Sequence, residues 1–135
     1  MRAVSFIVPG EPQGKGRHRT GKFGTYTPAK TVAYEGLIAF AAREAMQGQP
    51  LLEGPLLVRL RAIFSVPKSV SNKRREAMLA GDVEPTKKPD LSNILKAVED
   101  GCNGVVFHDD SAVTKHANEK VYGLTPCLQV TIEGK

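Results

Sequence analysis

The chain has 135 residues and a formal net charge of +5, with 41% hydrophobic and 24% charged residues. This length and composition suit a single globular domain, residues 1–135, with one hydrophobic core. No apolar run approaches the roughly 20 residues that span a membrane, and the apolar part of the N-terminus is too short for a signal peptide. We therefore expect a cytoplasmic protein without a membrane partner. The mild positive charge is compatible with a polyanionic partner but does not require one.

The first half of the chain predicts two strands and one long helix. Residues 3–8 (AVSFIV) are β-branched and aromatic, and a Pro-Gly pair ends them, which predicts a strand followed by a turn. Residues 10–28 lack an apolar period and predict a long loop. A helix is predicted from Pro28 to about residue 47. The apolar residues that fit its stripe are Val32, Leu37, Ile38, Ala41 and Ala42. In residues 56–66, apolar residues alternate with arginines, which predicts a strand with one buried face.

The second half of the chain predicts two helices and two further strands. A short helix is expected at 69–79 and a central helix at 91–103, followed by strands at 112–122 and 126–134. The last two strands are predicted to pair as a hairpin through Gly123. The residues of the final strand expected in the core are Cys127, Val130 and Ile132. These elements predict a single small α+β domain with a mixed or antiparallel sheet and packed helices.

The central helix has an apolar stripe that must pack into the core, and a polar face beside it. The stripe consists of Leu91, Ile94, Leu95, Val98 and Cys102. The polar face, about 100° away at the helical repeat, consists of Ser92, Lys96, Glu99 and Asn103. Cys102 and Cys127 lack metal-ligand spacing, and both are predicted to be small buried residues.

Five of the fourteen acidic residues lie between Asp90 and Asp110, and two interpretations of them remain open. In the first, Asp90 is the N-cap of the central helix and Asp109-Asp110 is a turn. In the second, these carboxylates meet, repel one another and attract a hard divalent cation such as Mg²⁺. Lys96 likewise is either a solvated helix residue or a cation placed beside a scissile phosphate.

Basic residues cluster in three places and are candidates for contacts with a phosphate backbone, which supply much of the affinity for nucleic acid and make it salt-dependent. The candidates are Lys15, Arg17, Arg19 and Lys22 in the predicted loop, Lys73, Arg74 and Arg75 in the short helix, and Lys87 and Lys88 before the central helix. A solvated loop is the alternative for the first group. Phe23 and Tyr26 are either stacking or packing residues, and His108 is either a general base or a turn residue.

The stretch KKPDLSNILKAVEDGCNGVVFHDDSAV, residues 87–113, resembles the signature segment of the RusA family of Holliday-junction resolvases. In that family the segment usually reads Pro-Asp-Leu-Asp-Asn, then a lysine three residues on, a helix, a short apolar turn, and Asp-Asp-Ser or Asp-Asp-Ala. FIVPGEPQGKGRHR (6–19) resembles the family's strand, turn and basic loop, and YTPAKTVAYE (26–35) resembles the start of its first helix. The resemblance covers most of the chain in order.

The resemblance implies a small α+β homodimer, bacterial or phage-encoded, that binds four-way junctions and related branched DNA. Each subunit would cut one strand with Mg²⁺ or Mn²⁺, in DNA recombination and repair. Carried over residue by residue, the resemblance assigns catalysis to Asp90, Lys96 and Asp110. It assigns metal binding to Asp90 and Asp110, with Asp109 beside them.

Ser92 departs from the family pattern, because the second motif position usually carries an aspartate. A neutral hydroxyl is a poorer Mg²⁺ ligand than a carboxylate. Three possibilities follow. Ser92 binds the metal weakly or through water; or one of Asp109, Glu99 and Asp100 supplies the missing charge; or the protein binds junctions but cuts them poorly. The leading hypothesis is a metal-dependent endonuclease. The alternatives are a junction- or DNA-binding protein with weak or no nuclease activity, and a basic structural protein whose acidic residues are caps and turns.

Overall fold

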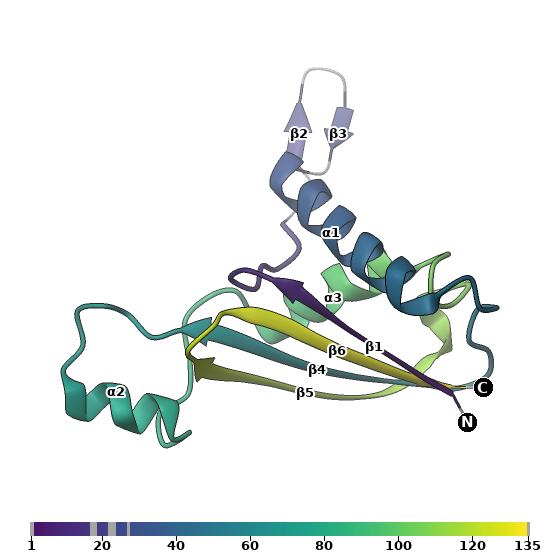
Figure 1. Ribbon diagram of the computed structural model, residues 1–135. Coiled ribbons are helices and arrows are strands. Elements are labelled where there is room, and N and C mark those ends of the chain that lie inside the picture. Colours follow the sequence, from purple (N-terminus) through teal and green to yellow (C-terminus); the bar gives the residue numbers. More distant parts are fainter. Residues whose placement is uncertain (1, 17–18, 22–23, 27, 135) are drawn as a thin grey trace.

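A four-stranded sheet with two helices on one face forms the framework of the protein (Figure 1). The computed structural model describes residues 2–16, 19–21, 24–26 and 28–134. In chain order the elements are β1 (Arg2–Pro9), β2 (Arg19–Gly21), β3 (Gly24–Tyr26), α1 (Ala29–Met46), β4 (Leu56–Ser65), α2 (Asn72–Leu79), α3 (Leu91–Cys102), the 3₁₀ helix η1 (Asp110–Ala112), β5 (Val113–Gly123) and β6 (Cys127–Gly134). The predicted small α+β domain is confirmed.

The strand order of the sheet is β1-β6-β4-β5, with β5 parallel to β4 and the other neighbours antiparallel. The mixed sheet is as predicted, but the predicted hairpin between the last two strands is wrong because β4 lies between them. The strand β4 suits this central place because it buries alternate side chains and pairs on both sides. By contrast, β5 carries the exposed Lys115, His116 and Glu119, which suit an edge strand.

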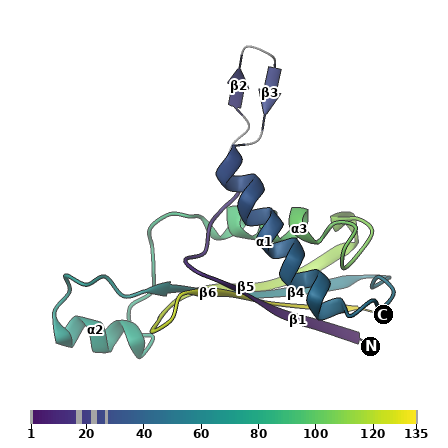
Figure 2. The same cartoon turned by 45° about the horizontal axis from the view of Figure 1, so that its top comes forward.

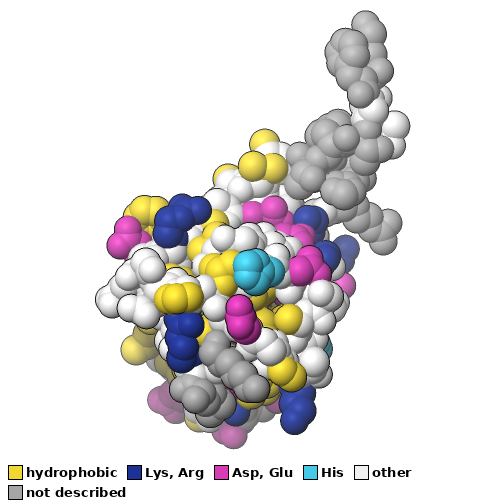
Figure 3. All heavy atoms as spheres, turned by 90° about the vertical axis from the view of Figure 1, so that its right-hand side faces the viewer, with side chains coloured by type: hydrophobic (Ala, Val, Ile, Leu, Met, Phe, Trp, Pro, Cys, Tyr) yellow, Lys and Arg dark blue, Asp and Glu magenta, His cyan; other side chains and the backbone are white. Residues whose placement is uncertain are grey.

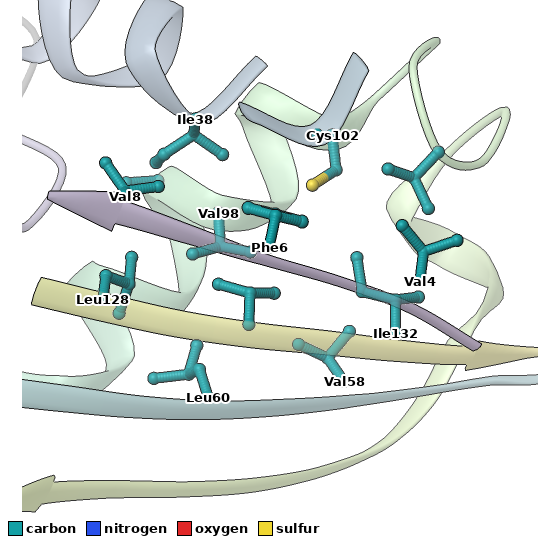
Figure 4. Close-up of a cluster of buried hydrophobic side chains, with 14 of the residues drawn as sticks. Val4, Phe6, Val8, Ile38, Val58, Leu60, Val98, Cys102, Leu128 and Ile132 are labelled. Atoms are coloured by element: carbon teal, nitrogen blue, oxygen red, sulfur yellow. The ribbon is translucent and has the colours of Figure 1, made fainter. Parts of the chain in front are cut away.

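The core lies between the sheet and the two helices α1 and α3, which cover the same face of the sheet (Figure 2). Figure 4 shows alternate side chains of β1, β4 and β6 meeting Ile38 of α1 and Val98 and Cys102 of α3. The two helices cross closely at Gly101, where a Cβ atom would lie 2.8 Å from Cγ2 of Ile38 and 3.1 Å from the carbonyl oxygen of Glu35. This close packing holds α3 in one orientation relative to the sheet.

The predicted limits of α1 are confirmed, but part of its predicted core stripe is wrong. Val32 and Leu37 are 55% and 52% exposed. The buried residues of the helix are Thr31, Tyr34, Ile38, Ala42 and Met46. Apolar residues occur all round this helix, so their spacing does not select the buried face. Packing against β1 and α3 selects it instead.

The set of buried side chains in β6 also differs from the prediction at one residue. Leu128, Val130 and Ile132 are buried, as alternation along a strand requires. Cys127 has the opposite parity and is only partly buried, so its predicted place in the core is wrong. Cys102 is buried as predicted, and burial raises the pKa of its thiol to about 12.

Two segments extend away from the helix-covered sheet. The predicted loop at 10–28 contains the hairpin β2–β3, which projects beyond the N-terminal end of α1 (Figure 1). The short helix α2 is confirmed, begins after the N-cap Ser71, and lies past the ends of β4 and β5, away from α1 and α3. Within the described ranges, no helix is both long and apolar enough to cross a membrane.

Candidate functional site

The helix α3 begins at Asp90, whose backbone is extended, with φ −68° and ψ 144°. The Asp90 side chain makes no capping hydrogen bond to the first turn, although its position is that of an N-cap. The carboxylate of Asp90 is exposed and therefore able to face a ligand. The buried stripe of α3 holds this end of the helix against the core.

A short turn after α3 brings Asp110 back beside the middle of the helix. Val106 and Phe107 are buried and anchor this turn, and the Gly104 amide donates a 2.7 Å hydrogen bond to the Phe107 carbonyl oxygen. As a result, Nζ of Lys96 lies 3.5 Å from Oδ2 of Asp110, across 14 positions of sequence. The predicted catalytic lysine and later aspartate therefore meet.

The two aspartates of the acidic pair have different environments. Asp109 accepts a 3.0 Å hydrogen bond from the Ser111 amide, and its bonds with Ser111 lower the pKa of its carboxyl. Asp109 thus has the turn function that the sequence left open, whereas Asp110 starts η1 and faces Lys96.

Glu99 adds a second carboxyl group near Asp110. Burial raises the pKa of Glu99, and the negative charge of Asp110 raises it further, while Lys96 and His116 act in the opposite direction. Glu99 and Lys96 are three positions apart on α3 and share one side of the helix. Of the three residues named as sources of the charge missing at Ser92, Glu99 and Asp109 are both influenced by Asp110.

The carboxyl groups of this region offer oxygen ligands, which a hard divalent cation prefers. Asp90, Asp110 and Glu99 are the candidates, and Ser92 adds a hydroxyl on the exposed side of α3. Within residues 2–16, 19–21, 24–26 and 28–134, no group of three or more His, Cys, Asp and Glu side chains has the arrangement of a metal site. These residues fit Mg²⁺ only as a partial ligand set, because Mg²⁺ usually keeps several waters and shares phosphate oxygens.

Residues 12–16 of the loop after β1 lie along the N-terminal part of α3. The Lys15 amide donates a 2.9 Å hydrogen bond to the Asn93 carbonyl oxygen, and the Gly16 amide donates one of 2.9 Å to Oγ1 of Thr31. Gly14 has no room for a side chain, since a Cβ there would lie 2.9 Å from Cβ of Asn93. The loop and α3 enclose a groove whose lining includes Lys30, Lys88 and Asp90.

The predicted DNA-binding residues are spread over several surfaces. The ammonium group of Lys15 is paired with Glu35, at 3.2 Å, and with Asp100. The exposed Lys87 and Lys88 precede Asp90, and Nζ of Lys120 donates a 2.6 Å hydrogen bond to the Lys87 carbonyl oxygen.

The remaining predicted residues lie away from α3 or outside the described chain. Exposed Lys73, Arg74 and Arg75 are on α2. Arg17, Lys22 and Phe23 lie outside the described residues, and for Arg19 and Tyr26 the description covers only the backbone. On the side of the molecule shown in Figure 3, the basic side chains lie apart from one another, among acidic and apolar ones.

Two comparisons relate this chain to known proteins. Residues 9–133 match the protein-family model described as endodeoxyribonuclease RusA. The chain is also 33% identical over 138 residues to a protein of Bacillus subtilis (strain 168) named "Uncharacterized protein YqaN", an alignment that covers 98% of this chain and 96% of that protein. Both matches span nearly the whole chain, including the loop after β1, α3 and η1.

The raised pKa of Glu99 has a testable effect on stability. A carboxyl group whose pKa is higher in the folded state holds its proton more tightly there, so its ionisation destabilises the fold. We expect Glu99→Gln to become more stable relative to the wild type as the pH rises from 4.5 through the raised pKa. Urea unfolding of both proteins across this pH range measures the difference. A stability difference that does not change with pH contradicts the proposed environment of Glu99.

Proposed function

Because the chain belongs to the RusA endodeoxyribonuclease family, we propose that it is a Mg²⁺-dependent nuclease for Holliday junctions and related branched DNA. It would resolve these structures by paired nicking of two strands, in recombination and repair. The observation that carries the proposal is the 3.5 Å distance between Nζ of Lys96 and Oδ2 of Asp110. Lys96 is on α3, the helix that begins directly after Asp90. Mn²⁺ is a second candidate metal.

In this proposal each residue of the site has a distinct task. Asp90 and Asp110 hold the metal, with Glu99 close enough to Asp110 to add negative charge. A bound Mg²⁺ would activate water and neutralise charge on the phosphate. Lys96 places its ammonium group beside Asp110, where it can neutralise a scissile phosphate or the leaving oxygen. The buried face of α3 orients these groups before DNA arrives.

The groove between residues 12–16 and α3 suits a DNA strand that leads to the site. Its lining includes loop residues 12–16, the basic residues Lys30 and Lys88, and Asp90. Phosphates held by Lys87 and Lys88 would lie close to Asp90. Arg17, Arg19 and Lys22 belong to the same loop in sequence, and α2 offers a separate basic contact for another arm of branched DNA.

Cutting two strands requires two active sites, and we propose that a homodimer supplies them. We propose further that its two subunits meet along an exposed seam on α1. The α1 seam consists of residues spaced alternately by three and four positions, all exposed: Lys30, Ala33, Leu37, Phe40 and Glu44. This spacing is that of a helix–helix seam. In an antiparallel pair with Leu37 at the two-fold axis, Lys30 of one copy faces Glu44 of the other, so the charges are complementary.

The uncovered face of the sheet is a less suitable dimer surface. It carries charged pairs, Arg59 with Glu133 at 2.9 Å and Arg61 with Glu119 at 2.5 Å, and it exposes Ile7 only at the edge strand β1. Antiparallel sheets often leave such a face in contact with water. The α1 seam, by contrast, exposes Leu37 and Phe40 side by side over one turn of helix.

We expect Phe40→Glu to convert a dimer into a monomer, because it would place a carboxylate in the apolar centre of the seam. Sedimentation equilibrium of the wild type and the variant measures this change. Leu124→Glu is the matched control, since Leu124 is also an exposed apolar residue but lies between β5 and β6. A dimer that survives Phe40→Glu, or a monomeric wild type, removes the α1 seam as the interface.

A junction-binding protein with weak or no nuclease activity is the second candidate function. It is favoured by Ser92 at a position where the family usually has an aspartate, together with the lack of a three-residue ligand group in the described ranges. The two functions share the same DNA contacts and differ only in the metal site.

Variants of the two proposed ligands distinguish these functions. We expect Asp90→Asn and Asp110→Asn each to lower the Mg²⁺-dependent cleavage of a synthetic four-way junction by about 100-fold or more, because each removes a negatively charged ligand of the proposed Mg²⁺ and with it the charge stabilisation that the metal would supply. Junction binding should be largely retained. Asp82→Asn, in the exposed loop before α3, is the control and should cleave like the wild type. Wild-type binding without any product supports the second function, and unchanged cleavage by either site variant removes the proposed metal site.

A further inference from the structure

We infer that Lys15 is a positioning residue that keeps Lys96 directed towards Asp110, rather than a phosphate contact. This inference rests on the proposed nuclease function. It starts from a chain of alternating charges that joins three parts of the fold: Glu35 of α1, Lys15 of the loop after β1, Asp100 and Lys96 of α3, and Asp110 of η1.

Asp100 is the member of this row of charges that contacts both lysines. One of its carboxylate oxygens accepts a hydrogen bond from Lys15, and the other lies 3.5 Å from Nζ of Lys96. Lys96 lies equally far, 3.5 Å, from Oδ2 of Asp110. Two carboxylates therefore compete for one ammonium group, and any change in the charge balance at Asp100 alters that competition.

Lys15 is well placed to weaken the attraction of Asp100 for Lys96 and so to leave Lys96 beside Asp110. Its side chain is 21% exposed and that of Asp100 is 19% exposed, so their attraction is less screened by water than that of a surface pair. Glu35 holds the same ammonium group at 3.2 Å from the α1 side. With Lys15 present, part of the negative charge of Asp100 is compensated, although Asp100 still raises the pKa of Lys96 more than Asp110 does. Without it, the uncompensated carboxylate attracts Lys96 away from Asp110.

The surroundings of Lys15 also argue against a role as a mobile phosphate contact. Its backbone amide is bonded to Asn93, and neighbouring Gly14 packs against the start of α3 without room for a side chain. Both carboxylate partners raise the pKa of Lys15, Asp100 more than Glu35. A DNA phosphate could use this ammonium group only by displacing two carboxylates. Lys96, at 52% exposed, is much more accessible to a substrate.

Lys15→Met removes the charge but keeps most of the apolar stem, and it tests the inference together with Asp100→Asn. We expect Lys15→Met to lower kcat for junction cleavage about 10-fold, as loss of a supporting partner commonly does. The double variant Lys15→Met/Asp100→Asn should regain most of that loss, because no competing carboxylate then remains. A double variant as slow as Lys15→Met contradicts the inference, since a lost loop anchor or phosphate contact is not restored by removing Asp100.

Salt dependence of junction binding gives a readout that does not need cleavage. If Lys15 only positions Lys96, the slope of log K against log salt is the same for the wild type and Lys15→Met. A slope that is smaller in magnitude by about 0.9, the value for one lost phosphate contact, overturns the inference. Lys88→Met serves as the comparison, because Lys88 is exposed beside Asp90 and should show that change. If the wild type binds junctions without cutting them, the proposed function fails while the slopes still test Lys15.

Discussion

The burial of one face of α3 between the sheet and α1 determines where every charged group of the site lies. Ile94, Val98 and Cys102 have no solvent exposure, and Gly101 lets α1 approach closely. A helix held in this way has little freedom to rotate, because its core side chains are close-packed. Lys96 and Glu99 therefore point to one side, and Asp90 stands at the helix start. The same burial anchors the turn that returns Asp110 to the helix.

Neighbouring charged residues on the exposed side of α3 have different interaction partners. Asp109 is bonded to its own turn, Asp110 faces Lys96, and Asp100 is shared between Lys96 and Lys15. Glu99 sits where burial and the charge of Asp110 both oppose its ionisation. In the proposed function, the carboxylates of this region would bind a divalent cation, and DNA phosphates would complete its coordination.

Much of this arrangement could be predicted from the sequence, and the failures have physical causes. The limits of α3 and its buried stripe follow from helical periodicity, and the juxtaposition of Lys96 with Asp110 was anticipated only through the family resemblance. The predicted β5–β6 hairpin is wrong because strands that are close in sequence need not pair: β4 pairs on both sides and separates the two strands. The predicted burial of Val32 and Leu37 is wrong because apolar spacing does not show which face of α1 the sheet covers. The partners of Lys15 are 20 and 85 positions away, and no local pattern indicates them.

Ser92 is the residue at which the proposed metal site can be tested most directly. It lies on the exposed side of α3, two residues after Asp90 and one helical turn before Lys96, so a carboxylate added there would lie on the same side of the helix as Lys96. The decisive measurement is the rate of four-way junction cleavage by Ser92→Asp and by the wild type across a Mg²⁺ titration. If α3 carries the metal site, Ser92→Asp cleaves about 10-fold faster at low Mg²⁺ and needs less metal for half-maximal rate. Identical Mg²⁺ dependence in the two proteins would contradict a metal site on this face of α3.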